Sequence, residues 1–190
     1  MFILKKNYYL IIESIKDVSL KTIKKRYKYI VIYRNQGKSE NKKLILNFRK
    51  LCKTLSVDFF VANNLSLANE LNSDGIYLSA YNHSFKPLTQ KKKKFRIIGS
   101  AHTNKEIYMK IKQGCKIILF SKLFPVKYDY KAPHLGVVKF NTFVNKNKNL
   151  IPLGGIHSQN LNSLKMIKCD GFALKSEIKK KPAKIFNRLF

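Results

Sequence analysis

The chain has 190 residues, 45% of them hydrophobic, which suits a single domain over residues 1–190 with a sizeable buried core. No run reaches the roughly 18 consecutive apolar residues that a membrane-spanning helix needs, so we expect no membrane partner. The lysine-bearing N-terminus is followed by neither a long apolar core nor a small-residue cleavage site, so we expect no secretion signal. Three widely separated cysteines form no CxxC pair, which argues against a zinc site or a disulfide framework and favours the cytoplasm.

The formal net charge is +29, with 39 lysines and arginines against 10 acidic residues. A charge of this size attracts nucleic acids through their phosphates. A dedicated nucleic-acid-binding protein, however, concentrates its basic residues in a patch, an arm or a recognition helix. Here the lysines occur in nearly every segment between the apolar runs. We therefore expect no specific nucleic-acid partner, and we interpret the lysine run at residues 91–94 as a solvated loop.

Eight short runs of apolar or β-branched residues recur along the chain, and several are apolar nearly throughout, as strands buried on both faces of a parallel sheet are. The predicted strands are Tyr8–Ile12, Tyr29–Tyr33, Phe59–Ala62, Gly75–Leu78, Phe95–Ile98, Lys116–Phe120, Leu150–Leu153 and Gly171–Leu174. Helical spacing of apolar residues occurs between them. One apolar stripe consists of Leu44, Ile45, Phe48, Leu51 and Cys52, and another consists of Leu161, Leu164 and Ile167.

Residues that start or interrupt helices predict two local features of the helical segments. Ser158 precedes the second stripe and is its predicted N-cap. The segment from His83 to Lys94 is a weak helix candidate, because it holds Pro87 and the lysine run.

The alternation of eight strands with helical segments predicts an α/β fold, a compact (β/α)8 TIM barrel. At 190 residues the barrel would be small, with short helices. An open, doubly wound sheet is the alternative, but no glycine-rich phosphate fingerprint follows the first predicted strand.

A TIM barrel binds its ligands at the C-terminal ends of its strands, and nearly all of the predicted strand ends are polar or small. Gly154 and Gly155 follow the seventh strand and let backbone amides approach a ligand closely. Ser176 follows the eighth strand and opens the last predicted helix, where free amides and the helix dipole favour a phosphate. These ends together predict a phosphate site. The alternative is a tight strand-to-helix turn that simply needs glycine.

His102 follows Gly99 and Ser100 at a strand end, so it either contacts a ligand, with proton exchange as one role, or caps the next helix. Asp74 and Asp170 each precede a glycine just before a strand, which predicts structural turns at the opposite end of the barrel. No pair of histidines has metal-ligand spacing, and loop positions are predicted for His83, His134 and His157.

An ordered set of segments resembles the thiamine phosphate synthase family, together with its thiazole tautomerase relatives. The segments, which span about residues 8–178, are SDGIYL at 73–78, GSAHT at 99–103, FP at 124–125, APHLG at 132–136, IPLGGI at 151–156 and GFALKS at 171–176. They resemble the family's ADGVHLG, G-x-S-x-H, FPT, P-LG, P-x-x-GGI and G-x-A-x-x-S elements. The resemblance implies a reaction that joins hydroxymethylpyrimidine diphosphate to thiazole phosphate and releases pyrophosphate, with Mg²⁺ as cofactor.

The resemblance also implies roles for individual residues. Arg34, Ser100 and His102 are the expected catalytic residues; Arg34 holds the pyrophosphate and Ser100 lines the pyrimidine side. Tyr33 and Gln36 belong to the same strand end as Arg34, with Asn63 beside the pyrophosphate. The full expected substrate-binding set is Tyr33, Gln36, Asn63, Lys122, Gly154, Gly155 and Ser176, of which the last three bind the thiazole phosphate.

The sequence departs from the family pattern where the leaving group binds. The family's QLREK segment reads IYRNQ at residues 32–36, so a glutamine stands in place of the pyrophosphate lysine. Asn64 and Asn82 stand where the resemblance places the Mg²⁺ carboxylates, and an amide oxygen binds this ion less well because it brings no charge. The tautomerase relatives carry a histidine where this chain has Lys122. Lysines, including Lys38, Lys122 and Lys127, are the candidate substitutes for the ion.

These observations leave two functions open beside bulk electrostatic binding of nucleic acid. The first is a thiamine phosphate synthase, a transferase that acts on small phosphorylated substrates. The second is a non-catalytic or tautomerase-like member that binds a thiamine-related phosphate. The oligomeric state stays open.

Overall fold

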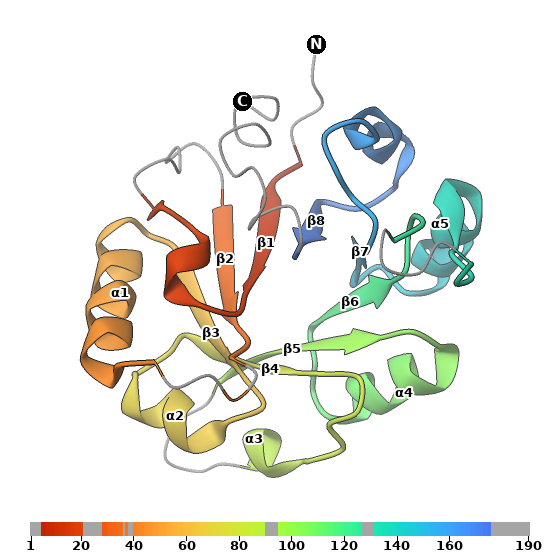
Figure 1. Ribbon diagram of the computed structural model, residues 1–190. Helices are drawn as coiled ribbons and strands as arrows, with labels where there is room; N and C mark the ends of the chain where they lie inside the picture. The colour runs from red at the N-terminus through yellow and green to blue at the C-terminus, as the bar shows by residue number, and fades with distance from the viewer. Residues whose placement is uncertain are drawn as a thin grey trace.

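In the computed structural model, residues 5–20, 28–35, 37, 40–89, 95–126 and 131–175 are described. Eight parallel strands within these residues close into one barrel, each strand pairing with its neighbours in chain order (Figure 1). The strands are β1 Asn7–Ile12, β2 Lys28–Tyr33, β3 Asp58–Ala62, β4 Gly75–Leu78, β5 Arg96–Ala101, β6 Ile117–Ser121, β7 Leu150–Leu153 and β8 Gly171–Leu174. The predicted (β/α)8 barrel is confirmed, and the open sheet is excluded because β1 pairs with β8.

The barrel has two apolar layers, because successive side chains of a strand point to opposite faces. The inner layer fills the barrel itself and consists of Tyr9, Ile11, Ile30, Ile32, Phe60, Tyr77, Ile98, Leu119, Ile151 and Ala173. The intervening strand residues point outward and join a second cluster that includes buried residues of the helices. Both faces of the strands are therefore buried, as their nearly continuous apolar sequences predict.

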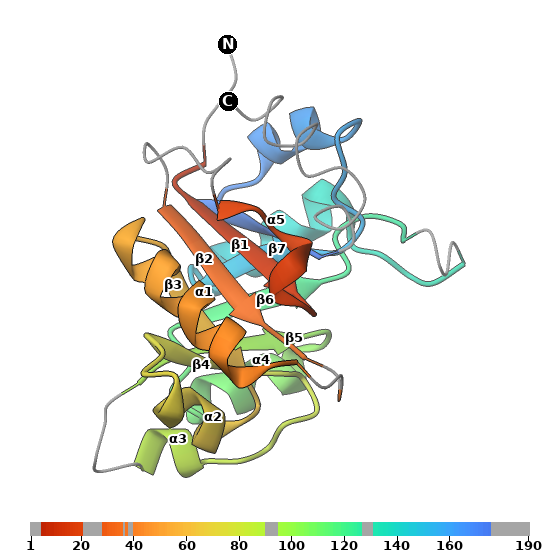
Figure 2. The ribbon, with the colours of Figure 1, turned by 60° about the vertical axis from the view of Figure 1, so that its left-hand side comes forward.

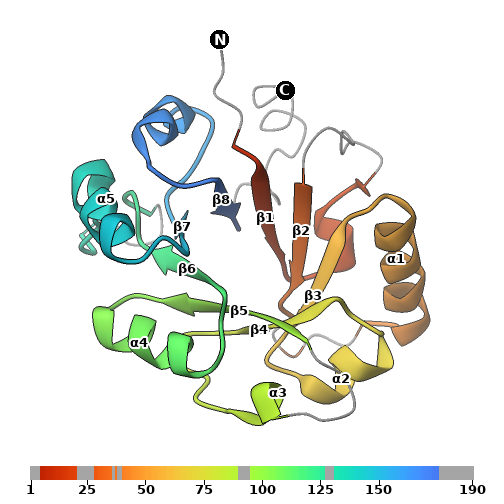
Figure 3. The same ribbon diagram turned by 180° about the vertical axis from the view of Figure 1, so that it is seen from behind.

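The helices lie on the outside of the barrel, as the two views from opposite sides show (Figure 3). The α-helices are α1 Lys42–Thr54, α2 Leu65–Glu70, α3 Lys86–Thr89, α4 Asn104–Lys112 and α5 Gly136–Lys146. The 3₁₀ helices η1 Ile15–Asp17 and η3 Leu161–Met166 lie in the intervals after β1 and β7. Figure 2 shows α1 lying along β2 and β3. None of the helices in the described ranges is long and apolar enough to cross a membrane.

Three sequence predictions differ from the structure in detail. Strand β5 continues to Ala101 instead of ending at Ile98, so Ser100 lies on the strand itself. The stripe of α1 is only partly buried: Leu44 and Leu51 are exposed, whereas Arg49 is buried. The second stripe forms the 3₁₀ helix η3, and its N-cap is Asn160 rather than Ser158. Leu161 and Leu164 are three residues apart, a spacing that fits the three-residue turn of a 3₁₀ helix.

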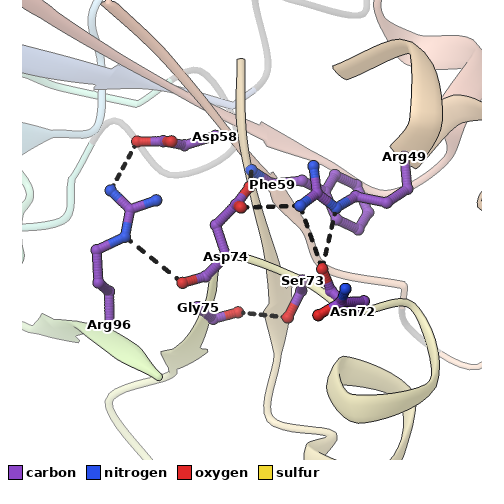
Figure 4. Close-up of polar contacts among 8 residues, drawn as sticks. All are labelled: Arg49, Asp58, Phe59, Asn72, Ser73, Asp74, Gly75 and Arg96. Atoms are coloured by element: carbon purple, nitrogen blue, oxygen red, sulfur yellow. Dashed lines mark hydrogen bonds and ion pairs between the residues drawn. The ribbon is translucent and has the colours of Figure 1, made fainter. Parts of the chain in front are cut away.

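Ion pairs close the N-terminal end of the barrel (Figure 4). The Arg96 guanidinium donates to Asp58 at 2.8 Å and lies over the Phe60 ring, with its central carbon 5.3 Å from the ring centroid. Lys28 adds a longer ion pair to the same carboxylate, and the pKa of Asp58 is lowered. Burial opposes ionisation of Asp58, and the hydrogen bond and charge of Arg96 outweigh it. Charged side chains therefore cover the inner layer at the N-terminal end of the barrel.

The predicted structural turn at Asp74 is confirmed at this end of the barrel. One oxygen of Asp74 accepts from Arg49 at 2.8 Å, and the other accepts from the backbone N–H of Phe59 at 2.8 Å (Figure 4). Arg49 also donates to the carbonyl oxygen of Asn72. The carboxylate thus ties α1, β3 and the turn before β4 together, which explains why α1 buries an arginine on its inner face.

Asp74→Asn is expected to lower the free energy of unfolding by about 1–3 kcal/mol, because an amide cannot accept both hydrogen bonds and the buried Arg49 loses its counter-charge. Urea unfolding followed by circular dichroism measures the change. Asp170→Asn is the matched control: Asp170 also precedes a glycine at the start of a strand, but its side chain is exposed, so we expect a change below about 0.5 kcal/mol. Equal losses in the two variants would contradict the assignment.

Candidate active site at the C-terminal mouth of the barrel

The C-terminal end of the barrel carries a layer of polar side chains directly above the apolar inner layer. Side chains two residues beyond an inward-pointing core residue point inward as well. Continuing the strands in this way places six polar residues around the opening, and we call them the mouth residues. They are Glu13, Arg34, Ser79, Ser100, Ser121 and Lys175. The three serines are buried, with 5–7% of their surface exposed.

Arg34 enters the mouth directly after β2. Its backbone N–H donates to the carbonyl oxygen of Ile12 at 2.8 Å, so the β1–β2 ladder extends through this residue and fixes its direction. The side chain is half-buried and close enough to Tyr77 for its charge to favour the ionised phenol. No described carboxylate pairs with the Arg34 guanidinium. The mouth therefore holds a cation whose charge is available to an anionic ligand.

Tyr77 marks the boundary between the apolar layer and the mouth. Its side chain belongs to the inner layer and is 1% exposed. Burial raises the pKa of the phenol, while a hydrogen bond with Ser100 and the charge of Arg34 act in the opposite direction. Tyr77 is therefore a neutral hydroxyl under Ser100 and Arg34, and no role was predicted for it from the sequence.

Tyr33 lies on the outer face of β2, away from the barrel interior. Its ring packs in the outer cluster, and its hydroxyl donates to Glu40 while accepting from the side chain of Asn35 at 2.7 Å. Burial, followed by the bond to Glu40, raises the pKa of Tyr33 to about 12. Glu40 also accepts from the Ser14 hydroxyl and from the backbone N–H of Ile15. Tyr33 thus supports the loop that follows Arg34 and joins it to the end of β1.

An asparagine pair links the ends of β3 and β4. The side-chain oxygen of Asn63 accepts from the backbone N–H of Ser79 at 2.9 Å and from the side chain of Asn82 at 3.1 Å. The Asn63 amide nitrogen donates to the Ser79 hydroxyl at 3.1 Å. Asn63 has a φ of 58°, a left-handed conformation that asparagine adopts more readily than most residues. Asn63 is therefore placed beside the mouth, where it holds Ser79 in position.

The residues at the expected Mg²⁺ position do not fit the ion. The Asn64 side-chain oxygen accepts from the backbone N–H of Leu67 at 2.9 Å, because it caps α2. The Asn82 side-chain oxygen accepts from the backbone N–H of Ser84 at 2.8 Å. Both oxygens are neutral, and Mg²⁺ demands an octahedral set of hard oxygen ligands that usually includes carboxylates. Across the described residues, no three His, Cys, Asp or Glu side chains gather at a place that suits a metal ion.

His102 and Ser121 form a pair between β5 and β6. The His102 Nδ1 and the Ser121 hydroxyl oxygen are 2.8 Å apart. The N-cap of α4 is Thr103, whose hydroxyl accepts from the backbone N–H of Glu106 at 3.3 Å, and Glu106 in turn accepts from the backbone N–H of His102. The capping function therefore belongs to Thr103, and the imidazole is left to face the mouth.

The glycines after β7 meet two structural demands. Gly154 and Gly155 have φ values of 93° and 69°, which strain any residue with a side chain. A Cβ atom on Gly155 would lie 2.4 Å from the carbonyl oxygen of Phe124, so the close approach of the β6 loop also requires glycine. The predicted tight turn that needs glycine is therefore confirmed. The backbone N–H groups of Gly155 and Ile156 donate to no described residue.

The rest of the predicted phosphate corner is partly described. Lys175, directly after β8, pairs with Glu13 from the end of β1 at 3.3 Å. Lys122 is half-buried in the β6 loop, and its backbone lies against Gly154. Ser176 and Gln36 lie outside the described residues, as do Lys38 and Lys127. No role was predicted from the sequence for Glu13, Ser79, Ser121 and Lys175; the two-residue period of each strand is the signal that groups them.

Comparison with known proteins agrees with this architecture. A thiamine-phosphate synthase from Haemophilus influenzae is 28% identical over 155 residues, which cover 75% of this chain and 68% of the relative. A thiamine-phosphate synthase from Staphylococcus haemolyticus is 29% identical over 144 residues, which cover 73% of this chain and 67% of the relative. The solved structure of a thiamine phosphate pyrophosphorylase from Pyrococcus furiosus superposes with a TM-score of 0.69 at 16% identity, covering 97% of this chain and 95% of that one, and supports the fold.

The family description gives the most extensive match. The sequence pattern of thiamine monophosphate synthase matches residues 5–178. This range begins before β1 and ends after β8, so it takes in every strand of the barrel and all of the mouth residues. The chain therefore belongs to the thiamine monophosphate synthase family.

Proposed function

We propose that this protein is a thiamine phosphate synthase, which joins hydroxymethylpyrimidine diphosphate to thiazole phosphate and releases pyrophosphate. The observation that carries the proposal is the family match over residues 5–178, together with a mouth that places the Arg34 guanidinium, which pairs with no described carboxylate, beside neutral hydroxyls. In the reaction, the bond between the pyrimidine methylene carbon and the diphosphate oxygen breaks, and the thiazole ring bonds to the same carbon. The protein must hold the diphosphate and keep water from the intermediate cation.

Arg34 is the proposed ligand of the diphosphate. A guanidinium forms paired, charge-assisted hydrogen bonds to phosphate oxygens and keeps its charge at any working pH. Its position over the inner layer, where water is scarce, strengthens the interaction with the developing negative charge of the leaving group. We place Gln36 and Asn63 beside it as neutral partners.

Ser100, Ser121 and His102 are the proposed contacts of the pyrimidine. The two buried hydroxyls offer donors and acceptors without adding a formal charge, which suits a ring that carries positive charge during the reaction. Ser121 also fixes the His102 ring by the 2.8 Å contact at Nδ1, which leaves the opposite ring nitrogen out of this contact. Ser121 is therefore a positioning residue for His102.

The corner formed by β7 and β8 is the proposed site of the thiazole phosphate. The backbone N–H groups of Gly155 and Ile156, which donate to no described residue, are suitable donors to phosphate oxygens. Ser176 and Lys122 complete the proposed corner. Lys175 lies at the same end but its charge is shared with Glu13, so we assign it to the barrel closure instead of the ligand.

Formation of thiamine phosphate from the two substrates by purified protein tests the proposal, with chromatographic detection of the product. Arg34→Gln is expected to lower kcat/KM at least about 100-fold, because it removes a charge that acts on the leaving group. Arg34→Lys restores the charge without the paired geometry and should recover part of the loss. Absence of product from the unaltered protein, with thiazole phosphate still bound in calorimetry, would instead identify a non-catalytic member of the family.

Ser121→Ala is expected to lower turnover about 10-fold, because His102 loses the partner that orients its ring. The ¹⁵N chemical shifts of the His102 imidazole should change in this variant, which a purely structural role for Ser121 would not produce. Ser73→Ala is the matched control, since Ser73 is a buried serine at the opposite end of the barrel whose hydroxyl bonds to the Gly75 carbonyl. Unchanged imidazole shifts in Ser121→Ala would refute the positioning role.

A further inference from the structure

Among the described residues, the carboxylates of the mouth loops are engaged in holding the protein together. Glu13 pairs with Lys175, and Asp17 accepts from the backbone N–H groups of residues 13 and 14. Glu40 accepts from three donors of its surrounding loops, and Glu106 accepts from the backbone of residue 102. None of these four groups lies in a set of three ligands suitable for a metal ion within the described part of the chain.

The side chains of Asn63, Asn64 and Asn82, at the ends of β3 and β4, also hold local structure. An amide oxygen has two lone pairs, and that of Asn63 accepts two hydrogen bonds. The side-chain oxygens of Asn64 and Asn82 each accept a backbone N–H. These contacts are built into a helix cap and a turn, so turning an amide oxygen toward a cation would break local structure.

A buried lysine fixes the asparagine loop from behind. Lys110 of α4 is 0% exposed, and its ammonium donates to the backbone carbonyl of Asn82 at 2.7 Å and to the side chain of Gln113 at 2.9 Å. Gln113 donates to the same Asn82 carbonyl at 3.0 Å. Burial lowers the pKa of Lys110. The Lys110 ammonium, the Gln113 side chain and the Asn82 carbonyl form hydrogen bonds with one another, so this cluster needs no ligand. Asn82 is therefore locked at its backbone and at both side-chain atoms.

We propose that the mouth binds the diphosphate group without a divalent metal ion, with Arg34 as the principal counter-charge. The inference rests on the proposed function, because diphosphate is the leaving group of that reaction. Where carboxylates and a metal ion would face the substrate, this chain has a closed network of neutral amides. The guanidinium of Arg34 faces the same opening and is paired with no described carboxylate. Positive charge is thus supplied by the protein, and the amides shape the site without attracting an ion.

Calorimetric titration of inorganic diphosphate into the full chain tests this inference directly, at constant ionic strength with either EDTA or Mg²⁺ present. We expect binding with one site per chain in EDTA and no increase in affinity on adding Mg²⁺. Binding that appears only with Mg²⁺, or that strengthens tenfold or more with it, would overturn the proposal. Absence of diphosphate binding in both conditions would overturn it as well.

Variants separate the mouth from the overall basic charge of the chain. In EDTA, Arg34→Gln is expected to weaken diphosphate binding about 10- to 100-fold, the loss typical for a hydrogen bond to a charged group. Lys50→Gln removes the same charge from an exposed position on α1 and should stay within about twofold of the unaltered protein. Equal weakening by the two variants would show that diphosphate is held only by the general positive charge, which would overturn the assignment to Arg34.

A metal titration gives a readout that does not depend on any substrate. Mn²⁺ added to the protein in place of Mg²⁺ should keep its free-ion electron paramagnetic resonance signal, whereas stoichiometric loss of this signal would contradict the inference. Failure of the proposed function has a different signature. Diphosphate binding in EDTA without formation of thiamine phosphate would sustain the metal-free site and reject the synthase.

Discussion

The alternation of side chains along the strands of a closed barrel is the constraint on which the rest of this structure depends. Because the barrel has no free sheet edge, each strand has one inward row and one outward row, and both are filled by apolar residues for most of their length. A polar residue is tolerated in the inward row only where the row meets solvent. Arg34 follows Ile32 and Ser100 follows Ile98 in this way. The same packing that stabilises the core therefore gathers the functional groups at one end.

The strand ends are held by side-chain contacts that join neighbouring loops, and these contacts recur around the barrel. Glu40 connects the loops after β1 and β2, Asn63 connects the ends of β3 and β4, and the His102–Ser121 pair connects β5 with β6. Lys175 and Glu13 connect β8 with β1. Each contact orders the loops before a ligand arrives, so less binding energy is spent on ordering them when the substrate enters.

The fold was predictable from the sequence because strand burial on both faces leaves a strong local signal. All eight strands were located within a few residues, and the largest difference was at β5, where Gly99 and Ser100 suggested an end but continue the strand. The site was less predictable. Tyr33 and Arg34 are adjacent in sequence, yet Tyr33 points outward from β2, whereas Arg34, directly after the strand, faces the interior near Tyr77. Ser121 could not be assigned a role because its partner His102 is 19 residues away and becomes its neighbour only through the pairing of β5 with β6.

The positive charge of the chain attracts anions both at long range and at short range, and only the short-range interaction selects a ligand. A net charge of +29 raises the local concentration of any anion, but exposed charges are screened beyond about 8 Å at physiological ionic strength. Arg34 is half-buried above an apolar layer, where the effective dielectric constant is lower and screening is weaker. The neutral amides of Asn64 and Asn82 leave this field uncompensated, whereas carboxylates at the same positions would cancel it unless a metal ion reversed their effect. Amides and a protein cation in place of a metal ion and its carboxylates therefore keep the electrostatic potential of the mouth positive. A diphosphate can then bind without a metal ion having to bind as well.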